Sequence, residues 1–147
     1  MISEGRADEL SDMPKVIDST WRWQYKSEKD KYEGEVPVLC RNEQTTLRLV
    51  GWINKRLSYS FSILHKGSIP IRRWGDHIGH TNPKGAEIDG PHKHKWREDV
   101  GTGYAYKTDD VSRDSVDDAF FDFLNEEAIE FNGQYYQFEE SRLDDWV

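Results

Sequence analysis

The sequence TLRLVGWIN at residues 46–54, followed by KRLSYSFSIL at residues 55–64, predicts a β-hairpin. In both halves large apolar residues alternate with polar or small ones, and a period of two is typical of a β-strand with one buried face. The apolar set includes Leu47 and Leu49 in the first strand and Tyr59 and Phe61 in the second. Serine occupies positions 58, 60 and 62, so the other face of the hairpin is expected to be polar and in contact with water.

Further strands are predicted on both sides of this hairpin. Residues 36–40 indicate an edge strand, because Pro37 has no backbone N–H with which to pair on both sides. Residues 69–74 predict a third strand that leads into a long polar loop, where the sequence NPKG at residues 82–85 is typical of a tight turn. Beyond the loop, residues 92–97 and 104–106 predict two more strands.

Two helices complete the predicted fold. Apolar residues recur at helical spacing after Ser115, which stands where an N-cap residue is expected. A shorter helix is predicted from Ser3 onward, and Pro14 is expected to end it. The sequence therefore predicts the α+β class: an antiparallel β-meander of five or six strands packed by a C-terminal helix, with a short N-terminal helix.

Length and composition limit the class of protein. With 147 residues, 35% of them hydrophobic and 13% aromatic, the chain is expected to form a single domain over residues 1–147, with its core at about 36–131 and a flexible acidic tail at 139–147. No apolar stretch is long enough to span a membrane, and residues 1–6 lack the apolar run of a signal peptide. The single cysteine, Cys40, excludes an internal disulfide. We therefore expect a cytoplasmic protein with no membrane partner.

Charge is unevenly distributed along the chain. The formal net charge is −8, but residues 41–97 carry a net +7 whereas residues 98–147 carry a net −12. All five histidines also lie within residues 41–97. A basic excess of this kind suits a surface that binds a polyanion such as RNA. The alternative is internal charge complementarity, in which the acidic C-terminal helix packs across a basic sheet, and the sequence leaves both open.

Residues with catalytic side chains concentrate between Arg72 and Arg97. Imidazole titrates near neutral pH, so one histidine can act as a general base while another acts as a general acid, and arginine can stabilise a phosphate. This chemistry cleaves RNA without a metal. The candidate catalytic residues are His80, His92, His94, Arg72 and Asn82. The candidate substrate-binding residues are Arg73, Lys93, Lys95, Arg97 and Trp96.

Two other interpretations of this segment remain open. In one, His77, His92 and His94 hold a divalent metal ion, because a His-x-His spacing places two imidazoles on one face of a strand. His80 and Asp76 are further candidate ligands in that case. In the other, the histidines only cap turns and the cations bind a protein partner. No other cofactor is expected, because the sequence has neither a phosphate-binding glycine-rich loop before a helix nor a His-Glu-x-x-His motif.

The tryptophans have two roles open to them. The indole rings at positions 21, 23, 52, 74 and 96 can stack on nucleobases or fill the core. Because a chain of this length has a small core, the sequence favours burial.

The order of short motifs in the middle of the chain resembles a known pattern. The sequence SIPIRRW at residues 68–74 is followed by HTNPKG at 80–85 and GPHKH at 90–94. This order resembles an uncharacterised family of small prophage and mobile-element proteins, over about residues 36–131. The segment at residues 91–94 is also distantly similar to TumE-type toxins of toxin–antitoxin modules. Residues 93, 95 and 96 depart from the family pattern, in which the strand is more hydrophobic.

The resemblance implies a mobile-genetic-element context and a toxin-like activity on RNA or translation. Carried over position by position, it implies the site residues Arg72, His80, Asn82, His92 and His94. The leading hypothesis is therefore a toxin-like protein of a toxin–antitoxin, prophage or defence locus, acting as a metal-independent ribonuclease. The alternative is a noncatalytic phage-encoded interaction protein, such as an inhibitor of a host nucleic-acid defence machine. Its acidic C-terminal block would imitate phosphate charge, and its partner would be a protein, either an antitoxin or a host target. The acids considered for that role are Asp114, Asp117, Asp118 and Asp122.

Overall fold

The computed structural model describes residues 2–76, 80–81, 87–88, 92–95, 105–107 and 115–138. From residue 76 to residue 107 it describes the backbone of the strands alone. The candidate residues His77, Asn82, Trp96 and Arg97 lie outside the described residues, as do Asp114 and the predicted tail at 139–147. None of the helices in the described residues is long and apolar enough to cross a membrane.

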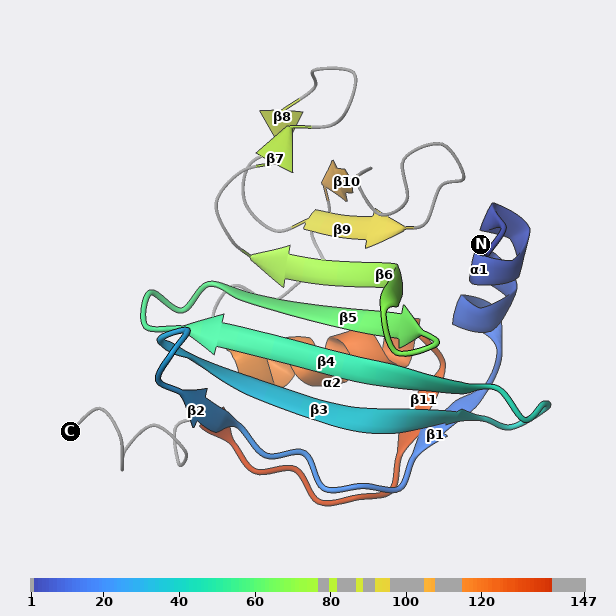
Figure 1. The fold of residues 1–147 in the computed structure, drawn as a ribbon, viewed down its shortest axis with the longest axis horizontal. Helices are drawn as coiled ribbons and strands as arrows, with labels where there is room; N and C mark the ends of the chain where they lie inside the picture. Colours follow the sequence, from blue (N-terminus) through green and yellow to red (C-terminus); the bar gives the residue numbers. More distant parts are fainter. Residues whose placement is uncertain are drawn as a thin grey trace.

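The order of elements confirms the predicted class (Figure 1). The helices are α1 (Glu4–Asp12) and α2 (Val116–Glu126), and the strands are β1 (Lys15–Ile17), β2 (Gln24–Lys26), β3 (Lys31–Cys40), β4 (Thr46–Asn54), β5 (Tyr59–His65), β6 (Ile69–Asp76), β7 (His80–Thr81), β8 (Glu87–Ile88), β9 (His92–Lys95), β10 (Ala105–Lys107) and β11 (Ile129–Phe131).

Most of these strands belong to one sheet, with the order β10-β9-β6-β5-β4-β3-β1-β11 and with β2 paired to β3. The six strands from β3 to β10 in this order are antiparallel neighbours, which confirms the predicted meander. The other end of the sheet was not predicted. There β1 pairs with β11 in parallel, so a strand that follows α2 returns to lie beside the first strand of the chain.

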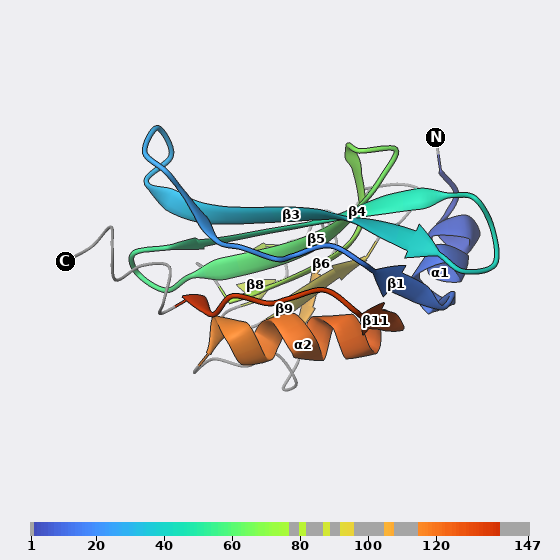
Figure 2. The same cartoon turned by 90° about the horizontal axis from the view of Figure 1, so that it is seen from below.

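Helix α2 packs along one face of the sheet (Figure 2). Ser115 is its N-cap, and the Ser115 hydroxyl accepts a hydrogen bond from the backbone N–H of Asp118, as the sequence predicts. The buried phenylalanines of α2 pack against aromatic side chains of the sheet. The ring of Phe123 lies 6.0 Å from that of Phe61 and 5.2 Å from that of Trp74, measured between centroids. These contacts fix which face of the meander is buried.

Helix α1 covers one end of the sheet and ends before Pro14, as predicted. Its last carbonyls are satisfied by a buried cation. The Lys15 ammonium donates to the carbonyls of Leu10, Ser11 and Met13 at 2.8, 2.7 and 2.9 Å. The N-terminal helix is thereby tied to β1 through one side chain.

The prediction of an edge strand at residues 36–40 is wrong for the strand as a whole. These residues are the end of β3, which has β4 on one side and both β1 and β2 on the other. Pro37 is tolerated because it falls between the two pairings, which use residues 31–33 with β2 and 39–40 with β1. Among the described strands, β3 is therefore an edge only over residues 34–38, which include Pro37.

Between β1 and β2 the chain does not pair with β3, and Trp21 lies in this segment. The backbone of Trp21 pairs instead with residues 134 and 136, while its buried ring lies against Gly34. A Cβ atom at Gly34 would lie 2.4 Å from Trp21 Cζ2, so only glycine fits there.

Candidate site on the open face of the sheet

The face of the meander opposite α2 carries no helix within the described residues, and we call it the open face. It faces the viewer in Figure 1, with α2 behind the sheet. Because successive residues of a strand point to opposite faces, the serine positions of β5 and their cross-strand partners belong to it. Its described members in the central strands include Glu33, Glu35, Val50, Trp52, Ser60, Ser62 and Arg73.

Strand pairing brings two predicted site residues together on this face. Arg73 of β6 lies directly opposite Ser62 of β5 on one side and His94 of β9 on the other. His92 lies opposite Gly75, which in turn lies opposite Ser60. The positions of both β9 histidines therefore belong to the open face. Arg73 and His94 are nearest cross-strand neighbours, about 5 Å apart at the Cα atoms.

Arg73 supplies a fixed positive charge at this point. Its side chain is half-buried, and burial lowers the pKa of the guanidinium from its usual value. Arginine nevertheless stays protonated in proteins. A half-buried guanidinium beside a histidine position is suited to bind an anionic group, because both the charge and its orientation are provided by the fold.

Arg72, the neighbouring residue, lies on the other face. Its guanidinium donates to the Asp8 carboxylate of α1 at 2.7 Å and to the backbone carbonyl of Ile71 at 2.9 Å. The side chain is 14% exposed. Its cross-strand partner on β9 is Lys95. Arg72 thus links β6 to the N-terminal helix, and it is separated from Arg73 by the sheet itself.

The remaining predicted residues are not brought to the same place. Lys93 lies opposite Trp74, so its position, like that of Lys95, is on the helix-covered side of the sheet. His80 belongs to β7, which pairs with β8 in a separate two-stranded sheet, where His80 lies opposite Ile88. That small sheet contacts β10 through β8. The described pairings therefore join Arg73, His92 and His94 and leave His80 apart.

One residue of this face was missed by sequence reasoning. Ser60 stands in the predicted polar set, but it is only 3% exposed, and its hydroxyl has no hydrogen-bond partner within the described part of the chain. It lies in the same cross-strand row as Gly75 and His92. The serine alternation identified the face, but it could not identify which hydroxyl is buried without a partner.

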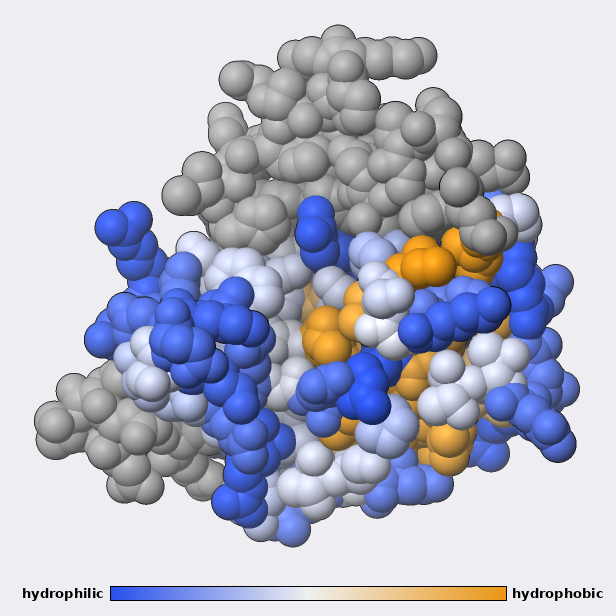
Figure 3. Space-filling model, viewed as in Figure 1, coloured by the Kyte–Doolittle hydropathy of each residue, from blue (hydrophilic) through white to orange (hydrophobic). Residues whose placement is uncertain are grey.

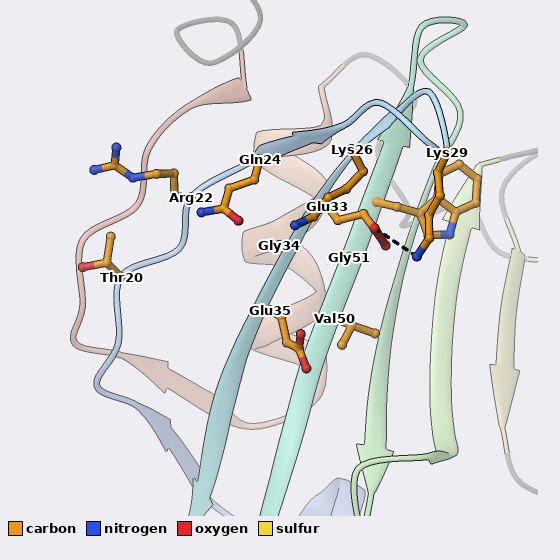
Figure 4. Close-up of a pocket in the computed structure, with 11 residues that line it drawn as sticks. Thr20, Arg22, Gln24, Lys26, Lys29, Glu33, Gly34, Glu35, Val50 and Gly51 are labelled. Atoms are coloured by element: carbon orange, nitrogen blue, oxygen red, sulfur yellow. Dashed lines mark hydrogen bonds and ion pairs between the residues drawn. The ribbon is translucent and has the colours of Figure 1, made fainter.

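A second missed feature is a hollow of about 450 Å³ at the β2 end of the open face (Figure 4). Its floor is the backbone of Gly34 and Gly51, which are cross-strand partners in β3 and β4. Polar side chains from β2, β3 and the turn between them line it, including Lys29 of the turn and Glu33 of β3, whose charged atoms are 3.3 Å apart. Trp52 forms part of its wall.

A comparison with protein families is informative once this geometry is known. The profile of the family of unknown function DUF6978 matches residues 2–129. The chain belongs to this family. The match agrees with the expected membership of an uncharacterised family, and it covers every strand of the open face. Searches of the curated proteins and of the solved structures found no match.

A metal site in this DUF6978 chain stays a prediction. Among the residues whose side chains are described, no three histidine, cysteine or carboxylate groups come together as metal ligands. The candidate ligands His77, His92 and His94 are not among those residues. Cys40 is described and is buried, and burial raises the pKa of its thiol, which makes it a poor nucleophile or ligand at neutral pH.

The acidic residues of α2 divide into two groups in the DUF6978 structure. Asp117 is structural, because its carboxylate accepts hydrogen bonds from the Tyr135 hydroxyl and from the backbone N–H of Phe138. Asp118 and Asp122 are exposed on the outer side of the helix, and Glu126 is exposed in its last turn. Only the second group is available to meet a partner.

Proposed function

We propose that this DUF6978 protein is a toxin-like ribonuclease of a toxin–antitoxin, prophage or defence locus, which cleaves RNA in the cytoplasm without a metal. The observation that carries the proposal is the strand pairing that puts Arg73 beside His94 on the open face, with His92 two residues away on the same strand. The resemblance of residues 91–94 to TumE-type toxins supports the same activity.

The chemistry requires two proton transfers and one anchored charge. A neutral histidine removes the proton from the ribose 2′-hydroxyl, whose oxygen attacks the adjacent phosphorus. A protonated histidine gives its proton to the leaving 5′-oxygen, so the P–O bond breaks and a 2′,3′-cyclic phosphate remains. His92 and His94 are assigned to these two steps. The Arg73 guanidinium stabilises the additional negative charge of the pentacoordinate phosphate.

In this proposal Arg73 takes the role that sequence analysis gave to Arg72, because Arg72 is already engaged by Asp8 on the other face. His80 and Asn82 remain candidate residues for orienting the substrate.

The test is cleavage of a labelled mixed RNA by purified protein, with and without EDTA. Wild type is expected to cleave in EDTA, whereas His92→Gln and His94→Gln are expected to lose activity about 100-fold or more. Arg73→Gln should retain the fold and lose activity to a similar degree. His65→Gln is the matched control, since His65 lies at the far end of β5, opposite Leu47 and Ile69.

Three results would contradict the proposal. If wild type does not cleave RNA, the protein is not a ribonuclease. If both histidine variants cleave as fast as wild type, the catalytic roles given to His92 and His94 are wrong. If EDTA stops cleavage, the histidines instead hold a metal ion.

A noncatalytic interaction protein is the second candidate, and one observation favours it. On the outer side of α2, Phe121 is 41% exposed between the exposed carboxylates of Asp118 and Asp122. An aromatic ring framed by acids suits a basic protein partner. Asp118→Asn with Asp122→Asn would then abolish binding to a captured partner, while the histidine variants would still bind it.

A further inference from the structure

Trp52 differs from the other tryptophans with described side chains. Trp21, Trp23 and Trp74 are between 0% and 3% exposed and belong to the core. Trp52 is half-buried and stands on the open face, where it lines both the 450 Å³ hollow and an adjacent one of about 380 Å³. The core therefore accounts for three of these rings but not for the fourth.

Cations line the two hollows beside this ring. They come from the chain before β2, from β2, from the start of β3, and from the β2–β3 and β4–β5 turns, and these two turns lie at the same end of the sheet in Figure 1. Figure 3 shows the hydrophilic side chains gathered over that end. The six that line the two hollows are Arg22, Lys26, Lys29, Lys31, Lys55 and Arg56. We call this group, with Trp52, the tryptophan patch. Arg22, at the far side of the larger hollow, also lies over the ring of Tyr136.

The patch stays positive after its carboxylates are counted. Three acids line the same hollows, and each already faces a cation. Glu33 pairs with Lys29 at 3.3 Å, Asp30 with Lys55 at 3.2 Å, and Glu35 with Arg48 at 2.6 Å. In a chain whose net charge is −8, this local excess of positive charge is a specific feature of one end of one face. Its charge is complementary to an anionic ligand.

Lys31 connects the charge to the ring. Its ammonium lies over the Trp52 indole, 4.7 Å from the ring centroid, in a cation–π contact. A nucleobase that stacks on the indole can take the place of this ammonium, which is then free to meet the adjacent phosphate. An aromatic platform beside cations is the usual arrangement of a single-stranded nucleic acid site.

We propose that the tryptophan patch binds single-stranded RNA, with one base stacked on Trp52 and the neighbouring phosphates held by Lys26, Lys31 and Arg56. The choice of RNA as the ligand rests on the proposed ribonuclease function. The two sites share a cross-strand row, in which Trp52, Ser60, Gly75 and His92 are successive partners. Three strand spacings separate Trp52 from His92, about 14 Å, which a short single strand can bridge.

The experiment measures binding apart from cleavage. The probe is a fluorescein-labelled 2′-O-methyl oligouridine, which lacks the free 2′-hydroxyl needed for cleavage, and the readout is fluorescence anisotropy against full-length protein. Trp52→Leu is expected to weaken binding about fivefold or more, and Trp52→Phe, which keeps an aromatic face, to weaken it less. Thermal unfolding of each variant verifies that it is folded.

Two double variants, each lacking two cations, test the contribution of charge to binding. Lys26→Gln with Arg56→Gln removes two cations of the patch. Arg41→Gln with Lys66→Gln removes two exposed cations from the opposite end of the sheet, so the net charge is identical. The first pair should weaken binding and reduce its salt dependence, and the second should leave both nearly unchanged. Equal effects of the two pairs would overturn the proposal, because binding would then follow net charge alone.

The results separate this proposal from the ribonuclease. Binding that depends on Trp52, in a protein that does not cleave RNA, supports the patch and removes the catalytic proposal. Cleavage by wild type together with unchanged binding by Trp52→Leu and Trp52→Phe overturns the patch and keeps the catalytic proposal. A labelled polyglutamate that binds as tightly as the oligouridine would show an acidic protein partner instead, and would also overturn it.

Discussion

The two faces of the central sheet come from the same strands, yet they are built from different chemistry. On the helix-covered face, aromatic rings meet one another, as where Phe61 lies 5.8 Å from Phe120 and 6.0 Å from Phe123. On the open face, the residues in between include serines, arginines, carboxylates and one half-buried tryptophan, with apolar residues such as Val50 among them. The first face holds the aromatic core of the fold, and the second carries the polar and charged side chains on which both proposals rest.

Adjacent arginines show how completely the sheet separates these roles. Arg72 and Arg73 are neighbours in sequence and have the same side chain, but Arg72 pairs with Asp8 of α1 while Arg73 lies opposite His94. A one-residue shift in register would exchange them. The chemistry of the site therefore depends on the pairing of β6 with β5 and β9 as much as on residue type.

The largest expected effect tests the helix-covered face. Phe120→Ala should lower the free energy of unfolding by about 3–5 kcal/mol, because a buried phenyl ring leaves a cavity when it is removed. Phe121→Ala, on the outer side of the same helix, should cost less, about 1–2 kcal/mol, since this ring is 41% exposed and its remaining contacts are with neighbours such as Phe131 and Tyr135. Urea denaturation measures both. Similar losses for the two would mean that α2 is not packed on the sheet by the face described above.

The fold was predictable where the signal is local. Alternation in residues 46–64 specified the hairpin, and Ser115 with the apolar spacing that follows it specified α2. The misassigned strand was the one whose environment depends on distant residues. Pro37 alone indicates an edge. Nothing near it in sequence shows that residues 24–26 will pair with β3 before Pro37, or that residues 15–16 will pair with it after Pro37.

The candidate site was predictable only within one strand. Alternation places His92 and His94 on the same side of β9, and the structure gives both positions to the open face. Which arginine joins them depends on the pairing of β6 with β5, and a register shift next to Ile63 alters that pairing. The tryptophan patch combines residues 22–31 with residues 52–56. The net charge of a continuous segment of sequence could therefore not reveal it.

An intermediate effect concerns a carboxyl group buried at the helix-covered side. Glu127 is 2% exposed and accepts a hydrogen bond from the Ser11 hydroxyl at 2.7 Å. Burial raises its pKa to about 7, against the opposing influence of that hydrogen bond and of Arg72 and Lys15. The folded state therefore binds a proton that the unfolded chain releases near pH 4.5. Stability should fall by about 2–3 kcal/mol as the pH rises from about 4.5 to about 7, and change little above that.

Glu127→Gln tests this pH dependence. The variant keeps the shape and the hydrogen-bond acceptor but cannot ionise, so it should match wild type at pH 4.5 and be the more stable protein at pH 8. Glu126→Gln, an exposed neighbour, is the control and should preserve the wild-type profile. If Glu127→Gln is instead destabilised at pH 8, the carboxylate is ionised in the folded protein and its attraction to Lys15 outweighs its burial.

The smallest expected effect lies on the open face, at Ser60. Its buried hydroxyl has no hydrogen-bond partner among the described residues, and an unpaired buried hydroxyl is destabilising. Ser60→Ala should therefore leave the free energy of unfolding unchanged or raise it by up to about 1 kcal/mol, with Ser62→Ala as the less buried control. A loss greater than 1 kcal/mol would show that the hydroxyl is paired within the protein. If Ser60→Ala leaves stability unchanged but weakens oligouridine binding, the Ser60 hydroxyl contacts the ligand. Its position between Trp52 and His92 in the cross-strand row fits that role, because packing alone would favour alanine there.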